Sequence, residues 1–217
     1  MAVSRLSVKG LLTSMRCFIG YLFVLTVIGS GCAGRSGTAS MPKPGRGIAE
    51  YREVTRQAHR AVADAVDSLE GLKTSAAQGS PQFVRFDRSF NELELTSIKA
   101  RARAEAIIAR GQNYFDEWKE QLAGATNRPA AQTNYNRLYD QFLNVRQRSG
   151  EVRDEFRPFM ARLRQFRARL DRPPSGESTA SEIDALATNG KRVLKALDSV
   201  SAALNEAEAQ LHAMRNQ

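Results

Sequence analysis

The residue types that metal and acid–base chemistry uses most, histidine and cysteine, are scarce in this chain. It has 2 histidines and 2 cysteines in 217 residues, and His59 lies far from His212. Glu208 and His212 are four residues apart and would share one helix face, but one such pair does not make a metal site. A di-iron bundle needs glutamates on two helices and a Glu-x-x-His motif on each of two others, and this set is missing. We therefore predict neither a metal site nor a cofactor.

Acidic residues gather beside the single tryptophan. Asp116, Glu117 and Glu120 flank Trp118, but carboxylates at these spacings are typical of a solvated helix face. No glycine-rich phosphate loop follows a strand pattern, and no serine or cysteine has a base placed to activate it. We therefore expect that the protein is not an enzyme.

The most specific predicted chemistry is at Cys32, because of the residues that precede it. Residues 1–31 carry three basic and no acidic residues, and an apolar run at 17–28 is followed by Gly-Ser-Gly and the cysteine. A charged start, an apolar run of about 12 residues and small residues before a cut site are typical of a secretory signal peptide. The run is short for a membrane-spanning helix, which needs about 20 apolar residues.

Small residues followed by a cysteine resemble the lipobox of bacterial lipoproteins, although Gly29 stands where the usual lipobox has leucine. In that class the thiol takes a diacylglycerol, the peptide is cut before the cysteine, and the new amino terminus is acylated. The resemblance implies lipidation at Cys32, whose acyl chains would hold the protein on a membrane. The alternatives are an uncleaved anchor and an ordinary signal peptide cut near Gly31.

The expected mature chain begins at Cys32, which would be its one cysteine, so no internal disulfide is expected. Ala33 is not the aspartate that resembles an inner-membrane retention signal, which favours the outer membrane if the host has one. Residues 32–47 are rich in glycine, serine and proline and show no apolar periodicity, as expected of a flexible tether. We expect an exported lipoprotein that faces the periplasm or the cell exterior.

The rest of the chain has the apolar spacing of helices. From Ile48 onward apolar residues recur at intervals of three and four, which favours left-handed supercoiling, and no segment alternates like a half-buried strand. The predicted helices span about 48–77, 81–123, 130–171 and 178–215. Their short connections make neighbouring helices antiparallel. The predicted fold is therefore all-α, an elongated up-down antiparallel bundle or coiled coil of about four helices.

Four polar residues interrupt the apolar seams of these helices, namely Thr55, Ser97, Gln121 and Ser149. Buried polar residues set the register of some coiled coils. They could also mark places where helices part. From the sequence we favour a role in register, or no role, over a ligand site.

Arginines concentrate in the third predicted helix. Residues 128–172 contain 11 arginines against 5 acidic residues, in a chain whose formal net charge is +9. The candidates for binding anionic lipid, an envelope polymer or an acidic partner are Arg157, Arg162, Arg164, Arg167 and Arg169. The alternative, which the sequence favours, is that these arginines pair with acidic residues of adjacent helices. Nucleic acid is not an expected partner, because an exported chain does not meet it and no recognition module is visible.

Three short motifs in the helical region carry a family resemblance. They are RAEAIIARGQNYFDEWKEQL at 103–122, Tyr-Asn-Arg-Leu at 135–138 and Phe-Arg-Pro-Phe-Met at 156–160. Together they resemble an uncharacterised bacterial family, the domain of unknown function numbered 2959. The sequence departs from that family after Leu170, where Asp-Arg-Pro-Pro replaces the family's Lys-His-Asn-Leu-Asn. The resemblance implies an exported, helical, coiled-coil-like protein and names no activity.

These patterns predict a lipid-anchored bacterial cell-envelope protein that acts as a non-catalytic structural or protein-interaction rod. Its expected partners are the membrane, through the lipidated N-terminus, and an envelope protein that the sequence does not identify. Assembly with further copies of itself is an open alternative. The alternative function is binding of anionic lipid or envelope polymer through the arginine-rich third helix.

Overall fold

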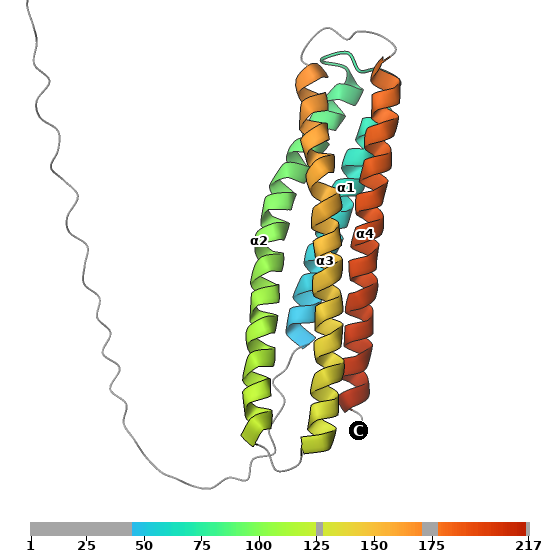
Figure 1. The fold of residues 1–217 in the computed structure, drawn as a ribbon. Helices are drawn as coiled ribbons and strands as arrows, with labels where there is room; N and C mark the ends of the chain where they lie inside the picture. Colours follow the sequence, from blue (N-terminus) through green and yellow to red (C-terminus); the bar gives the residue numbers. More distant parts are fainter. Residues whose placement is uncertain (1–44, 125–127, 171–177, 216–217) are drawn as a thin grey trace, which may run out of the picture. The chain divides into compact units, whose positions relative to one another are not determined.

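The computed structural model describes residues 45–124, 128–170 and 178–215. Within these ranges the chain forms α1 (Gly45–Gly71), α2 (Pro81–Gly124), α3 (Arg128–Leu170) and α4 (Ser178–Arg215), and no strand. Successive helices run antiparallel and lie side by side as a bundle (Figure 1). The all-α prediction is confirmed. The 44 residues of α2 give it a length of about 66 Å at 1.5 Å per residue.

The start of α1 differs from its predicted start at residue 48. α1 begins at Gly45, so residues 45–47 are helical, although they were expected to belong to the flexible tether. An ion pair within the first turns supports this extension, because Arg46 Nε lies 3.2 Å from Glu50 Oε1, four residues along the helix. The earlier part of the predicted tether, 32–44, lies outside the described residues.

The end of α1 also differs from the prediction. α1 ends at Gly71 rather than near residue 77, and Leu72 follows in a turn whose N–H donates to Leu69 O at 3.1 Å. Leu72 and Ala76 nevertheless pack against the apolar core. The apolar pattern continues past the last helical turn, which is why it predicted too long a helix.

The start of α2 has the expected capping arrangement. Ser80 Oγ accepts a hydrogen bond from the Phe83 N–H at 3.1 Å, and Pro81 takes the first helical position, where an N–H has no partner within the helix. The preceding Gly79 has a φ of 82°, a left-handed conformation that glycine adopts at little cost. α2, α3 and α4 begin and end within two residues of the predicted bounds.

An apolar core follows the bundle in three clusters. The first contains Phe86, Leu69 and Leu163, and the burial of a side chain such as Phe86 contributes about 1.5–3 kcal/mol. The second cluster lies around Val145 and Leu204. The third is rich in aromatic side chains and consists of Phe115, Trp118, Leu122, Tyr135, Leu138 and Leu211. The seams predicted from the apolar spacing are therefore the surfaces that the helices bury.

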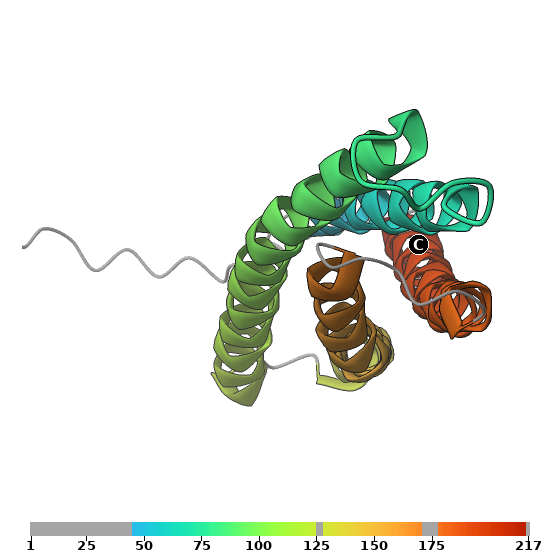
Figure 2. The ribbon, with the colours of Figure 1, turned by 90° about the horizontal axis from the view of Figure 1, so that it is seen from above.

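The four helices are joined unequally around the bundle. α1 packs closely against both α2 and α4, and α3 packs closely against α4, whereas α2 and α3 make the fewest contacts of any touching pair (Figure 2). The close approach of α4 to α1 depends on Gly190, because a Cβ atom there would lie 2.3 Å from Val66 Cγ2. The bundle is thus closed on three sides and least closed between α2 and α3.

Candidate functional site

Small side chains face each other across the seam between α2 and α3. On α2 they are Ser97, Ala100 and Ala104, and on α3 they are Ser149 and Gly150. Packed helix axes lie about 8–10 Å apart at their closest, and side chains this small fill little of the space between them. A cavity follows from this local choice of residues.

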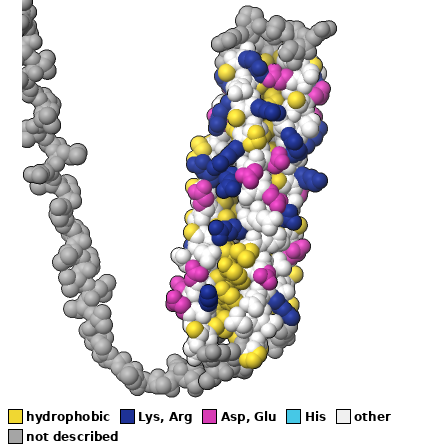
Figure 3. Space-filling model, viewed as in Figure 1, with side chains coloured by type: hydrophobic (Ala, Val, Ile, Leu, Met, Phe, Trp, Pro, Cys, Tyr) yellow, Lys and Arg dark blue, Asp and Glu magenta, His cyan; other side chains and the backbone are white. Residues whose placement is uncertain are grey.

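The cavity has a volume of about 610 Å³ and is lined by residues of all four helices. Its inner wall includes Val54, Val62, Leu93, Leu197 and Val200, all of which are buried. Along the same seam, hydrophobic side chains reach the surface with basic side chains beside them (Figure 3). The volume lies within the range of about 300–1,000 Å³ that is usual for small-molecule sites.

Close contacts between α2 and α3 bound the cavity at both ends. Toward the aromatic cluster, a Cβ atom on Gly111 would lie 2.6 Å from Phe142 Cε2, so the two helices nearly touch there. Toward the other end, Arg164 Nε lies 2.6 Å from Glu94 Oε1. One turn further, Arg167 pairs with Asp87 at 2.8 Å. The helices therefore part over a limited stretch.

A partly buried hydroxyl pair connects α1 to α3 at the cavity. Tyr51 Oη and Ser149 Oγ are 2.6 Å apart, and Ser149 Oγ also donates to Val145 O at 2.7 Å. Because Ser149 uses its proton on that carbonyl, Tyr51 is the donor to Ser149. Burial raises the pKa of Tyr51, so its hydroxyl remains protonated at neutral pH.

Three of the four polar seam residues singled out in the sequence lie at this one cavity. Thr55, Ser97 and Ser149 all line it, whereas Gln121 is exposed elsewhere on α2. Thr55 Oγ1 donates to Tyr51 O at 2.9 Å and Ser97 Oγ donates to Glu94 O at 2.7 Å, so both satisfy their polar groups within their own helices. The structure thus agrees with the alternative in which polar seam residues mark where helices part.

Basic residues dominate the charged part of the cavity lining. The lining contains one acidic residue, Glu105, and five arginines: Arg101, Arg146, Arg153, Arg157 and Arg164. Arg101 lies 3.9 Å from Glu105, and Arg153 lies 3.3 Å from its neighbour Asp154. Within the described residues, Arg146 and Arg157 are exposed and have no hydrogen-bond or ion-pair partner.

The five arginines predicted as anion-binding candidates do not form one site. Arg157 and Arg164 line the cavity, while Arg162 is exposed, lies outside it and has no partner among the described residues. Arg164, Arg167 and Arg169 pair with Glu94, Asp87 and Glu182 of adjacent helices. Pairing across helices, the alternative that the sequence favoured, therefore accounts for three of the five.

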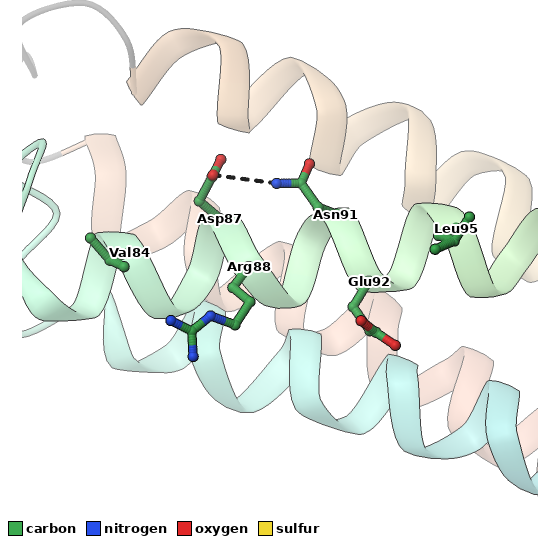
Figure 4. Close-up of a pocket in the computed structure, with 6 residues that line it drawn as sticks. All are labelled: Val84, Asp87, Arg88, Asn91, Glu92 and Leu95. Carbon is green, nitrogen blue, oxygen red and sulfur yellow. Dashed lines mark hydrogen bonds between the residues drawn. The ribbon is translucent and has the colours of Figure 1, made fainter.

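A second hollow, of about 450 Å³, is formed by α2 alone. Figure 4 shows Asp87 and Asn91 on one side of α2, Arg88 and Glu92 on the other, and Val84 and Leu95 between them. The Asp87 carboxylate already accepts hydrogen bonds from Asn91, at 3.3 Å, and from Arg167. With walls from one helix, this hollow has no opposite face to enclose a ligand.

The histidines lie apart from one another and from the cavity. His59 Nε2 is 3.3 Å from Asp198 Oδ1 at the α1–α4 surface, and His212 is exposed near the end of α4. A hydrogen bond from Arg52 lowers the pKa of Glu208, the residue that shares a helix face with His212. Within the described ranges, no three histidine, cysteine or acidic side chains are placed to hold a metal ion.

The residues Phe-Asp-Glu-Trp at 115–118, in the middle of the 103–122 motif, lie partly in the apolar core and partly at the surface. Phe115 and Trp118 are buried in the aromatic cluster with ring centroids 6.2 Å apart, and Trp118 meets Tyr135 edge-on at 5.3 Å. Asp116 and Glu117, like Glu120, are exposed, as expected of a solvated face. The aromatic residues of the motif therefore hold one end of the bundle together.

Two buried polar atoms near this end were not anticipated from the sequence. Tyr114 Oη and Gln141 Oε1 are buried and have no hydrogen-bond partner among the described residues. Burial raises the pKa of Tyr114 to about 12. Tyr114 is on α2 and Gln141 is on α3, beside the close contact of Gly111 with Phe142.

Cys32 and the predicted signal peptide lie outside the described residues. In the part of the chain that the structure does describe, no helix has a stretch long and apolar enough to span a bilayer. Comparisons of the chain with protein-family models, curated proteins and solved structures gave no match.

Proposed function

We propose that the protein is a lipid-anchored bacterial cell-envelope protein that acts as a non-catalytic interaction rod, held at a membrane through Cys32. The observation that carries the interaction role is a stripe of exposed apolar residues on α2. Val84, Leu95 and Ile98 are 47%, 51% and 62% exposed, so the bundle leaves these large side chains in solvent.

The three residues share one face of α2. At about 100° per residue, spacings of 11 and 3 residues place them within an arc of about 60° on a straight helix. Exposed apolar residues at such spacings are what a partner helix packs against in helix–helix recognition. The proposed partner is therefore a helix of another envelope protein, and the rod displays this stripe at the distance that the tether allows.

Site-specific photo-crosslinking in cells tests this role. A photoreactive amino acid at position 95 should capture a defined envelope protein, whereas the same group at the exposed Arg103 position, on a different face of α2, should not. Leu95→Glu with Ile98→Glu should reduce recovery of that protein at least fivefold without changing helix content, because both side chains are already in solvent. Equal capture at positions 95 and 103 would contradict the proposal.

Binding of an anionic ligand at α3 is the second candidate function. It is favoured by Arg146 and Arg157, which lie at the cavity and have no acidic partner among the described residues. Guanidinium groups bind carboxylates and phosphates through paired hydrogen bonds, and an unpaired guanidinium keeps these donors available. The pairing of Arg164, Arg167 and Arg169 leaves Arg157 and Arg162 of the five predicted arginines, and of these two only Arg157 lines the cavity, where Arg146 joins it.

A further inference from the structure

We propose that the α2–α3 cavity binds one ionised long-chain fatty acid, with its chain inside the bundle and its carboxylate among the arginines at the rim. This proposal narrows the second candidate function to one cavity and one ligand class. Ile98 belongs both to the stripe on α2 and to the cavity lining, but the proposed ligand does not require a partner helix on the stripe. Three properties of the cavity support the proposal.

The first property is the size of the cavity. A methylene group occupies roughly the volume of a liquid water molecule, about 30 Å³. A cavity of about 610 Å³ therefore holds on the order of 20 such groups. This matches one long acyl chain rather than the two chains of a phospholipid.

The second property is the apolar character of the inner wall. Val54, Leu93 and Val200 present hydrocarbon from three helices. The polar groups of Thr55 and Ser97 are satisfied by carbonyls of their own helices, and Tyr51 is satisfied by Ser149. An acyl chain beside these three residues would therefore leave none of their hydroxyl groups unpaired, and each buried methylene contributes to binding.

The third property is the position of the charges. α2 and α3 are antiparallel, and the Arg164–Glu94 and Gly111–Phe142 contacts set their register. This register places Arg101 of α2 at the level of Arg153 and Arg157 of α3, on opposite sides of the opening. The α3 wall of the mouth is thus positive, while on the α2 wall Arg101 is balanced by Glu105, the one acid of the lining. A carboxylate at the mouth would complement this charge, and a cationic amphiphile would not.

Isothermal titration calorimetry on the full-length chain tests the proposal with three probes. Palmitate should bind with one site per chain. Hexadecyltrimethylammonium, which has the same chain and the opposite charge, should bind at least tenfold more weakly. Acetate, which has the headgroup without the chain, should not bind measurably. Equal affinity for palmitate and for the cation would overturn the proposal.

Substitutions test whether palmitate binds in the cavity or elsewhere on the protein surface. Ala104→Leu fills the cavity and should weaken palmitate binding at least tenfold. Arg153→Glu with Arg157→Glu reverses charge at exposed positions, so it should retain the fold and also weaken binding at least tenfold. Arg162→Glu is the matched control, because it lies on the same helix outside the cavity and should bind like the unsubstituted chain. Unchanged affinity in either of the first two variants would overturn the proposal.

Two other occupants give different results. If the acyl group at Cys32 fills the cavity, palmitate will bind the Cys32→Ser chain but not the native one, and the proposal of a free ligand fails. If a second copy of the chain fills it, Ala104→Leu will convert a dimer to a monomer while palmitate has no effect, and the proposal also fails. Crosslinking at position 95 is independent of all these outcomes, so failure here is distinguishable from failure of the interaction role.

Discussion

Burial of the Tyr114 hydroxyl costs folding free energy that no hydrogen bond to a described residue offsets. The hydroxyl is buried and has no hydrogen-bond partner in the described part of the chain, and the same is true of Gln141 Oε1 on α3. A buried hydroxyl that has lost its water costs about 1–3 kcal/mol unless a partner replaces that water. The aromatic ring itself is well placed, with centroids 5.0 Å from Phe115 and 5.8 Å from Trp118.

Tyr114→Phe tests this interpretation. It keeps the ring contacts and removes the hydroxyl, so we expect the free energy of unfolding at neutral pH to rise by about 1 kcal/mol or to stay unchanged. Urea denaturation followed by circular dichroism measures this quantity. A loss of more than about 1 kcal/mol would contradict the absence of a partner for this hydroxyl.

The same tyrosine makes stability depend on alkaline pH. Burial raises the pKa of Tyr114 from 10 to about 12, so the folded state favours the neutral phenol. This contribution is fully present below pH 10 and is lost as the pH rises through about 12. The Tyr114→Phe variant should therefore lose less stability than the native chain over that interval.

At the level of single residues, the sequence singled out three of the residues that line the cavity, but it did not predict a cavity. The interruption of the apolar seams identified Thr55, Ser97 and Ser149. It did not show that these residues meet, because the spacing within a helix says nothing about its register against another helix. Arg101 was missed for the same reason, since it lines one cavity with Arg157 only when α2 lies beside α3. Arg146 was missed because it lies outside the second half of α3, where the arginines are most concentrated.

At the level of the helices, two glycines have opposite surroundings. A Cβ atom at Gly190 of α4 would lie 2.3 Å from Val66 Cγ2 and 3.3 Å from the Phe159 ring. A Cβ atom at Gly150 of α3 would meet nothing closer than an Arg153 nitrogen at 4.0 Å. The first glycine brings two helices together, while the second only weakens its own helix.

Alanine substitutions should separate these two roles. Gly190→Ala should lower the free energy of unfolding by about 1–3 kcal/mol, because the new methyl group overpacks the α1–α4 contact. Gly150→Ala should raise it by up to about 1 kcal/mol, because alanine favours the helix and has room. Thermal unfolding of both variants measures the difference. Similar effects of the two substitutions would contradict the close approach at Gly190.

The extent of each helix was largely predictable, and the arrangement of the helices was not. The spacing of three and four located α2, α3 and α4 because each buries one continuous stripe. The spacing failed at the end of α1, where Leu72 and Ala76 reach the core without helical hydrogen bonds. The spacing also could not predict which pairs of helices pack most closely. The packing of α2 against α3 is loose because small residues of the two helices, which are far apart in the sequence, face one another across the seam.

At the level of the whole molecule, the proposed anchor makes a direct prediction. Cells given an alkyne-tagged fatty acid should label the native protein, and Cys32→Ser should abolish the label and release the protein from the membrane fraction. Cys17→Ser is the matched control and should keep both properties, because Cys17 lies inside the expected signal peptide. Label retained in the Cys32→Ser chain would contradict lipidation at this residue.

Ion pairs beside the α2–α3 cavity join the two helices that pack together least closely. Arg164–Glu94 and Arg167–Asp87 join α2 to α3 through side chains that solvent reaches, in addition to aromatic contacts such as Trp118–Tyr135. The more closely packed helix pairs also have exposed ion pairs, among them Arg52–Glu208 between α1 and α4 and Arg192–Glu155 between α3 and α4. Dissolved salt screens charges in contact with solvent and leaves hydrocarbon burial in place. Ionic strength therefore weakens ion pairs on every side of the bundle, and we expect its largest effect between α2 and α3, where the fewest other contacts hold the helices together at the mouth of the cavity.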